Sequence, residues 1–95
     1  MKPLRFEWDP RKNLENQRKH GVSFEEAQAV FLDENALMIH DPDHSDDEDR
    51  FVLLGLSATI RLLAVCHCYR KSEEVIRIIS ARKATRKEQK RYWER

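Results

Sequence analysis

The chain begins with apolar and charged residues that alternate over residues 4–8, a pattern that predicts a short strand. The Asp-Pro pair at residues 9–10 then places an N-cap residue before a proline at the first helical position. Gly21 can adopt the left-handed conformation that ends a helix, so we predict a helix over residues 10–20. Leu14 is almost its only large apolar side chain, so we expect this helix to lie on the surface.

A second helix is predicted to begin directly after this glycine. Ser23 and Glu26 have the spacing of a capping box, in which each side chain satisfies a backbone N–H at the helix start. Phe24, Ala27 and Val30 recur at helical spacing and give the predicted helix one buried face.

The second part of the chain is predicted to form strands joined by short connections. Four apolar segments, over residues 35–40, 51–57, 61–69 and 75–81, have the length and composition of strands. Short connections favour an antiparallel meander. The segment 41–49 is rich in acidic residues and cannot pack, so it is predicted to be a loop.

A closing helix is predicted over residues 84–94, where Thr85 and Glu88 repeat the capping-box spacing. The fold class is therefore α+β, an antiparallel four-stranded sheet with two N-terminal helices and a C-terminal helix, in a single domain over residues 1–95. Within the segment 61–69, the side that carries Ala64 and Cys66 is wholly apolar or thiol, so we expect that side to face the helices. The opposite side would present a basic and aromatic surface.

The composition indicates where the protein is located and how its cysteines are used. No apolar run reaches the ~18 residues that span a bilayer, and the N-terminus lacks the apolar core of a signal peptide, so we expect a cytoplasmic protein. Cys66 and Cys68 are too close along one strand for a good disulfide, and no second pair of ligands has a zinc-like spacing. We interpret them as core thiols and predict no cofactor.

The net charge of +1 conceals a strong segregation along the chain. Residues 1–22 carry six basic and three acidic groups, residues 23–50 carry one basic and ten acidic, and residues 51–95 carry eleven basic and four acidic. A basic C-terminal half favours a polyanionic partner, which the charge of the whole chain would not indicate.

Three arginines are candidates for holding a phosphate. Arg61, Arg77 and Arg82 lie on two strands that are predicted to be neighbours, and Arg82 stands where the last strand meets the closing helix. Arginine binds phosphate through two N–H groups and keeps its charge, so it suits the charged transition state of phosphoryl chemistry. The alternative is that these arginines are solvated or form ion pairs.

Two histidines are candidates for acid–base chemistry, because imidazole titrates near neutral pH. His20 lies at a predicted helix end and His44 in the acidic loop. Alternatively, His20 caps helix carbonyls and His44 simply sits among acids. His40 and His67 are interpreted as structural.

The closing helix offers further contacts for a polyanion. Its basic side includes Lys83, Arg86 and Lys87, and Tyr92 could stack on a base or pack against the sheet. A solvated surface is the alternative for these charges. A metal site built from His40, Asp41, Asp43 and His44 is a further alternative.

Several short motifs occur in a fixed order along nearly the whole chain: Phe6-Glu7-Trp8-Asp9-Pro10, Lys12, Asn16, Lys19 through Ala27, Val30-Phe31-Asp33, Asp41-x-x-His44-Ser45 through Arg50, Gly55-x-Ser57, and Ile76 through Arg82 with Ala84, Glu88 and Tyr92. In this order they resemble the BrnT toxins of bacterial type II toxin–antitoxin pairs. The resemblance implies a small RelE-like fold, ribonuclease activity that blocks translation, and neutralisation by a DNA-binding antitoxin of the ribbon-helix-helix type. The family usually has glycine where this chain has Ile60.

Together these features predict a metal-independent endoribonuclease. His20 or His44 would help a ribose 2′-hydroxyl attack the adjacent phosphorus, while Arg61 and Arg82 converge on that linkage and stabilise its charge. Arg77 and the basic helix would position the RNA, and the products would be a 2′,3′-cyclic phosphate and a 5′-hydroxyl. The alternatives are a non-catalytic module that binds RNA or a partner protein, and a metal-dependent nuclease.

Overall fold

The computed structural model describes residues 4–40, 50–71 and 74–95, and within them it contains one five-stranded sheet. The strands follow the order β1-β5-β4-β3-β2 across the sheet. Their bounds are β1 (Arg5–Glu7), β2 (Leu37–His40), β3 (Phe51–Leu56), β4 (Leu62–Arg70) and β5 (Val75–Lys83). β2 to β5 pair antiparallel, as the short connections predicted.

The prediction of a four-stranded, wholly antiparallel sheet is wrong in one respect. β1 joins the sheet as a fifth strand and runs parallel to β5, with Phe6 opposite Ile76. The two segments lie far apart in sequence, so no local pattern reveals that they pair. The sheet is therefore mixed.

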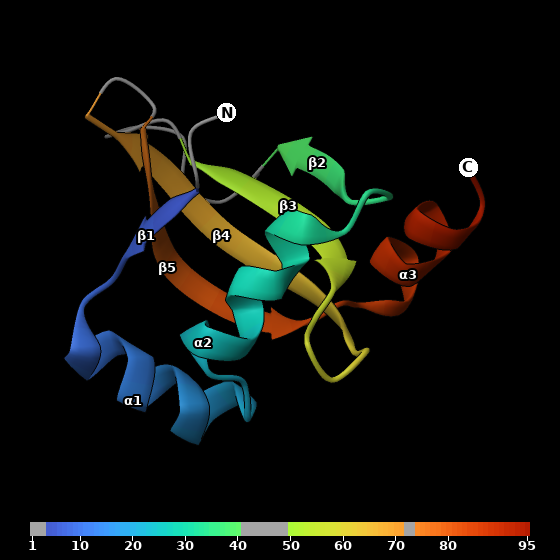
Figure 1. The fold of residues 1–95 in the computed structure, drawn as a ribbon. Helices are drawn as coiled ribbons and strands as arrows, with labels where there is room; N and C mark the ends of the chain where they lie inside the picture. Colours follow the sequence, from blue (N-terminus) through green and yellow to red (C-terminus); the bar gives the residue numbers. More distant parts are fainter. Residues whose placement is uncertain (1–3, 41–49, 72–73) are drawn as a thin grey trace.

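The helices are α1 (Pro10–His20), α2 (Phe24–Ala27), the 3₁₀ helix η1 (Gln28–Leu32) and α3 (Arg86–Trp93). Figure 1 shows α2 and η1 crossing one face of the sheet, α1 beside the same end as α2, and α3 on the far side of the molecule from α1. The second predicted helix is thus a short α-helix that continues as η1. In the described part of the chain, no helix combines the length and apolar character that crossing a membrane requires.

The predicted boundaries of α1 and the predicted capping box of α3 are confirmed, although α3 is shorter than the predicted 84–94. The Asp9 carboxylate accepts a hydrogen bond from the Arg11 N–H, and Gly21 takes a left-handed φ of 69°. Thr85 and Glu88 form a reciprocal capping box at the start of α3. Only half of the predicted box at α2 forms, because Ser23 accepts from the Glu26 N–H while the Glu26 side chain turns to other partners.

α1 docks onto the sheet through amides rather than through an apolar stripe. Asn16 donates to the Ala81 carbonyl and accepts from the Ala81 N–H, at 2.8 and 3.1 Å, so it pairs with the open edge of β5 as a strand would. The same amide donates to the Val22 carbonyl at 2.8 Å. Leu14 is exposed, as predicted for a surface helix. The amides therefore fix α1 against β5.

The main core lies between the sheet and the α2–η1 segment. We call this side of the sheet the inner face; its buried residues are Leu53, Leu63, Val65, Ile78 and Ala81, which pack against Phe24, Ala27 and Val30. The opposite, outer face carries Val52, Leu54, Ala64 and Cys66, which pack with Ala84 and with Tyr92 of α3. Both cysteines are free and buried, as predicted.

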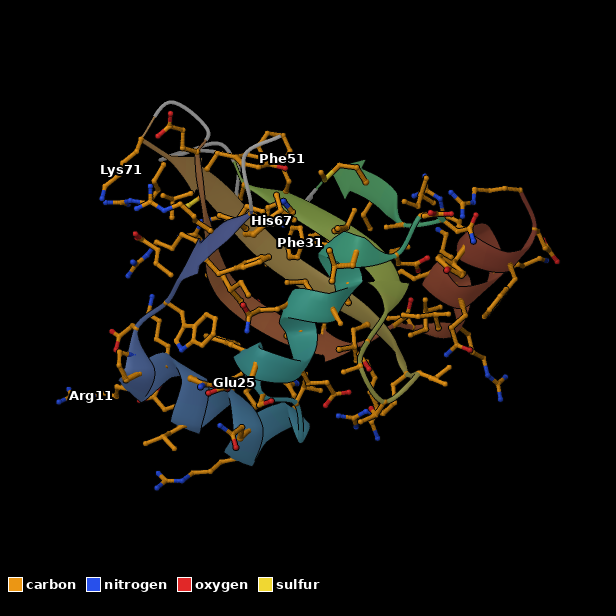
Figure 2. The ribbon with its side chains drawn as sticks, viewed as in Figure 1. Arg11, Glu25, Phe31, Phe51, His67 and Lys71 are labelled. Atoms are coloured by element: carbon orange, nitrogen blue, oxygen red, sulfur yellow. The ribbon has the colours of Figure 1, made fainter. Side chains whose placement is uncertain are left out.

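The predicted facing of β4 is wrong for α2 and η1, because the side that carries His67 packs against them, while the side that carries Ala64 and Cys66 packs against α3. His67 is fully buried, and its ring lies 4.8 Å from that of Phe31 and close to Phe51 (Figure 2). Its Nδ1 is 3.1 Å from the Val65 carbonyl oxygen, and burial lowers its pKa. A neutral histidine can therefore replace an apolar side chain in this core, which the composition of the strand did not indicate.

Candidate active site

His20 is the last residue of α1 and borders a concavity between that helix and β5. We call this concavity, of about 220 Å³, the α1–β5 groove. It is lined by Lys12, Glu15, Asn16, Lys19, His20, Ile79 and Ser80. The residues from α1 stand three, four, seven and eight positions after Lys12, so they share one side of the helix.

The electrostatic surroundings of His20 favour its neutral form. Burial, followed by the positive charges of Lys19 and Arg82, lowers the pKa of His20 below its usual 6.5. A neutral imidazole can accept a proton at neutral pH. Arg82 lies two residues after Ser80, which lines the groove with His20.

Arg82 is held in one orientation by Glu88 of α3. Its two terminal nitrogens donate to the two carboxylate oxygens at 2.7 and 3.0 Å, and its side chain remains 39% exposed. Glu88 also accepts from the Thr85 N–H at 2.9 Å. These contacts, the one with Arg82 first, lower the pKa of Glu88. The arginine at the strand–helix junction is thus fixed by the same carboxylate that caps α3.

Arg61 precedes β4 and is held by Glu26 of α2. Its Nε donates to Oε2 at 2.9 Å and its terminal nitrogen to Oε1 at 2.5 Å. The hydroxyls of Ser57 and Thr59 also donate to Oε2, each at 2.6 Å. The Arg61 hydrogen bond, with those from the two hydroxyls, lowers the pKa of Glu26 to about 2.

The structure brings Arg61 and Arg82 to one end of the sheet but on opposite faces. Arg61 contacts α2, which covers the inner face, whereas Arg82 pairs across the sheet with Ala64 on the outer face and contacts α3. Both reach the end of α1: Arg61 donates to the Gly21 carbonyl at 3.0 Å, and the charge of Arg82 acts on His20. The prediction that Arg61 and Arg82 converge on one linkage is therefore wrong, because they lie on opposite faces of the sheet. Of the two, Arg82 is the one whose charge acts on His20.

Of the other residues predicted to contact RNA, some lie near Arg82 and others do not. Arg77 lies toward the opposite end of β5 and donates to Glu7 at 2.7 Å. Three basic residues are exposed near Arg82, namely Lys83, Arg86 and Lys87. Tyr92 is buried, and its hydroxyl donates to Asp33 at 2.5 Å, so the structure supports packing rather than base stacking for this residue.

His44 lies outside the described residues, and so do Asp41 and Asp43 of the alternative metal site. Among the residues that are described, no three His, Cys, Asp or Glu side chains are grouped so that they could hold a metal ion.

Comparison with known proteins identifies the family. Residues 8–88 match the model of BrnT, the ribonuclease toxin of type II toxin–antitoxin systems. The chain belongs to the BrnT family. The crystal structure of the Brucella abortus ribonuclease toxin BrnT is similar, with a TM-score of 0.67 and 26% sequence identity over 88% of this chain and all of the other. No curated protein sequence matches the chain.

Membership in the BrnT family confirms the predicted function: this chain is a ribonuclease toxin of a type II toxin–antitoxin system. Such a toxin acts on RNA and has an antitoxin as its partner.

Sequence reasoning proposed His20 and Arg82 as site residues but did not propose Lys12, Lys19 and Ser80, which line the same groove as His20. The signal was the spacing of the two lysines on one helix face, which an exposed helix also shows when its lysines are merely solvated.

Proposed function

We propose that this BrnT toxin is a metal-independent endoribonuclease whose reaction takes place at the C-terminal end of α1. His20 takes the proton from a ribose 2′-hydroxyl, and the 2′-oxygen attacks the adjacent phosphorus. The bond to the 5′-oxygen breaks, this oxygen takes up a proton, and the products are a 2′,3′-cyclic phosphate and a 5′-hydroxyl. Side chains supply both the base and the positive charge, so the mechanism requires no metal ion.

One observation carries this proposal: His20 lines a groove together with Lys12 and Lys19, and burial with the charges of Lys19 and Arg82 lowers its pKa. Arg82 stabilises the charge that develops on the phosphate oxygens. Arg61 lies on the inner face, where it holds the Gly21 carbonyl at the end of α1. Lys83, Arg86 and Lys87 are exposed on the Arg82 side and guide the RNA toward the groove, while Arg77 contacts it further along β5. His44 is the second candidate for the base.

The biological consequence that we propose is inhibition of translation in the cytoplasm, relieved by an antitoxin of the ribbon-helix-helix type that also binds DNA. A neighbouring reading frame for such a protein, and its co-purification with this chain, would support the partner. Co-purification of an antitoxin with another DNA-binding fold would contradict that part of the proposal.

The rival function is a non-catalytic module that binds RNA or a partner protein. It is favoured by the carboxylate partners of the three arginines, since Arg61, Arg77 and Arg82 each form an ion pair in the folded chain. Such a module would bind RNA in a salt-sensitive manner and produce no new RNA ends.

The test is to map the 5′ and 3′ ends of RNA after incubation with the purified toxin, with and without EDTA. We expect cleavage in EDTA and 2′,3′-cyclic phosphate ends. Arg82→Ala should cleave roughly 100-fold more slowly. Arg82→Lys keeps the charge but cannot donate two parallel hydrogen bonds, so its cleavage rate should lie between those of Arg82→Ala and the wild type. Arg91→Ala, an exposed position of α3, is the matched control for lost charge.

Thermal melting of each variant separates loss of chemistry from loss of folding, because Arg82→Ala leaves Glu88 without this partner. Undiminished cleavage by Arg82→Ala would reject its assigned role. Binding without new ends would favour the module, and activity that disappears in EDTA would favour a metal nuclease.

A further inference from the structure

The α1–β5 groove contains basic and hydroxyl side chains to which the proposed reaction gives no role. Lys12 and Lys19 lie on the helix side of this groove, and Ser80 lies on the strand side. The inference below rests on the proposed function, because it concerns the RNA on which His20 and Arg82 are proposed to act.

The walls of the groove are fixed relative to one another. Asn16, which is itself buried and lines the groove, joins α1 to both the N–H and the carbonyl of Ala81. Ser80 is the neighbour of Ala81 in β5 and lines the strand side of the groove. The site is therefore organised before any ligand binds, which reduces the entropic cost of binding.

The size of the groove favours a small part of a polymer over a free organic ligand. Its volume is about 220 Å³, whereas pockets for drug-sized molecules are roughly 300–1,000 Å³. An open, shallow site of this kind suits one phosphate and its sugar on a longer chain.

The charge of the lining favours an anion. Lys12 and Lys19 are both exposed, Glu15 is the single acidic lining residue, and Arg82 adds positive charge nearby. Glu15 stands four residues before Lys19, a spacing at which the two side chains can meet on the helix surface. The lysine ammonium groups and the Ser80 hydroxyl are all hydrogen-bond donors, the groups that phosphate oxygens require.

We propose that the α1–β5 groove binds the RNA phosphate next to the cleaved linkage, with Lys12 and Lys19 as its cationic contacts and Ser80 as a hydroxyl donor. His20 lines the groove, and Arg82 lies two residues after Ser80 in β5. A strand whose phosphate lies in the groove therefore presents the following linkage to these two residues. The groove acts by positioning and contributes to affinity for RNA more than to the chemical step.

The test compares two double variants of the same helix. Lys12→Gln with Lys19→Gln removes two charges from the groove, whereas Arg11→Gln with Arg18→Gln removes two exposed charges that do not line it. Figure 2 shows Arg11 pointing away from the sheet. The probe is a short RNA oligonucleotide with 2′-O-methyl groups on every ribose, which lacks the nucleophile and cannot be cleaved.

We expect the lysine double variant to bind this probe roughly 10-fold more weakly and to reduce the salt slope of binding by about one to two. The arginine double variant should bind as the wild type does. Cleavage at sub-saturating enzyme should fall in the lysine double variant by about the same factor as its binding, whereas the arginine double variant should cleave at the wild-type rate.

A second measurement reports on the site itself. The charged groups that line the groove with His20 are Lys12, Glu15 and Lys19 from α1, and the charge of Arg82 from β5 also acts on His20. Binding of a phosphate among them should raise the pKa of His20, followed by NMR of its ring protons, in the wild type and in the arginine double variant. The lysine double variant should show no such rise.

Equal binding by the two double variants, or a His20 pKa that does not respond to the probe, would overturn the groove assignment. Failure of the wild type to cleave RNA would instead reject the proposed function, while a probe-dependent pKa of His20 would still establish that the groove binds phosphate.

Discussion

Glu26 is the carboxylate around which the turn between β3 and β4 is organised, and Glu26→Gln is expected to destabilise the fold substantially. Its two oxygens accept from Arg61 at 2.5 and 2.9 Å and from the hydroxyls of Ser57 and Thr59 at 2.6 Å. Glutamine preserves the shape and one acceptor oxygen. It removes the negative charge and turns an N–H₂ group toward donors that then have no acceptor.

The size of this effect follows from the pKa of the carboxyl group. It is lowered from 4.5 to about 2 in the folded chain, and each pKa unit corresponds to ~1.4 kcal/mol. The ionised group therefore contributes up to about 3 kcal/mol to the free energy of unfolding at neutral pH, and the variant should lose about 2–3 kcal/mol of it. Because the folded pKa is depressed, this contribution is complete above pH 4.5 and is lost as the pH falls toward 2.

The assay is urea unfolding at a series of pH values for the wild type, Glu26→Gln and the control Glu25→Gln. Glu25 is the adjacent residue, is exposed, and accepts one hydrogen bond from Asn13 at 2.9 Å (Figure 2). The control should change the free energy of unfolding by no more than about 0.5 kcal/mol. A Glu26→Gln variant as stable as this control, or one that retains the acid sensitivity of the wild type, would refute the assigned role of Glu26.

Three further substitutions test other parts of the fold by thermal and urea unfolding. Gly55→Ala should cost about 1–3 kcal/mol, because the new Cβ would lie 2.8 Å from Val30 Cγ1; an unchanged stability would show that η1 shifts freely. Ile60→Gly should stabilise the chain by about 0.5–1 kcal/mol, since Ile60 has a φ of 60° and is exposed; a loss of stability would mean that its side chain packs. Tyr92→Phe should cost about 1–2 kcal/mol through the lost hydrogen bond to Asp33. Since the Tyr92 pKa is raised from 10.0 to about 12, wild-type stability should also fall above pH 10 more steeply than that of Tyr92→Phe.

The features that the sequence predicted well depend on residues a few positions apart. The start of α1 requires only Asp9 beside Pro10, and its end requires Gly21. The capping box of α3 involves Thr85 and Glu88 alone. Such signals are complete within one turn of helix, so no knowledge of the tertiary structure is needed to recognise them.

The features that it missed depend on partners far along the chain. The Asn16 amide bonds to Ala81, which lies 65 positions away, and an asparagine on an exposed helix gives no sign of such a partner. The parallel pairing of β1 with β5 was missed for the same reason. For His67, the strand pattern could not show that a neutral imidazole would fill the inner core.

In the candidate site, too, the residues with a local signal could be predicted and those defined by tertiary contacts could not. His20 and Arg82 could be proposed from residue type, because each stands at the end of a predicted element where side chains remain accessible. The lysines of the groove could not, since only the docking of α1 on β5 distinguishes them from solvated surface charges. Likewise, the carboxylates that hold Arg61 and Arg82 come from other elements of the fold.

The identity of the general base is tested most directly by the rate of RNA cleavage against pH, measured in EDTA for the wild type, His20→Gln and His44→Gln. In the wild type the rate should fall below a pKa lower than 6.5, because His20 must be neutral to take the proton. His20→Gln should lose roughly 100-fold or more of the rate, together with that acidic limb, and His44→Gln should retain both. Loss of the rate and of the acidic limb in His44→Gln, with His20→Gln close to the wild type, would contradict the site at the end of α1.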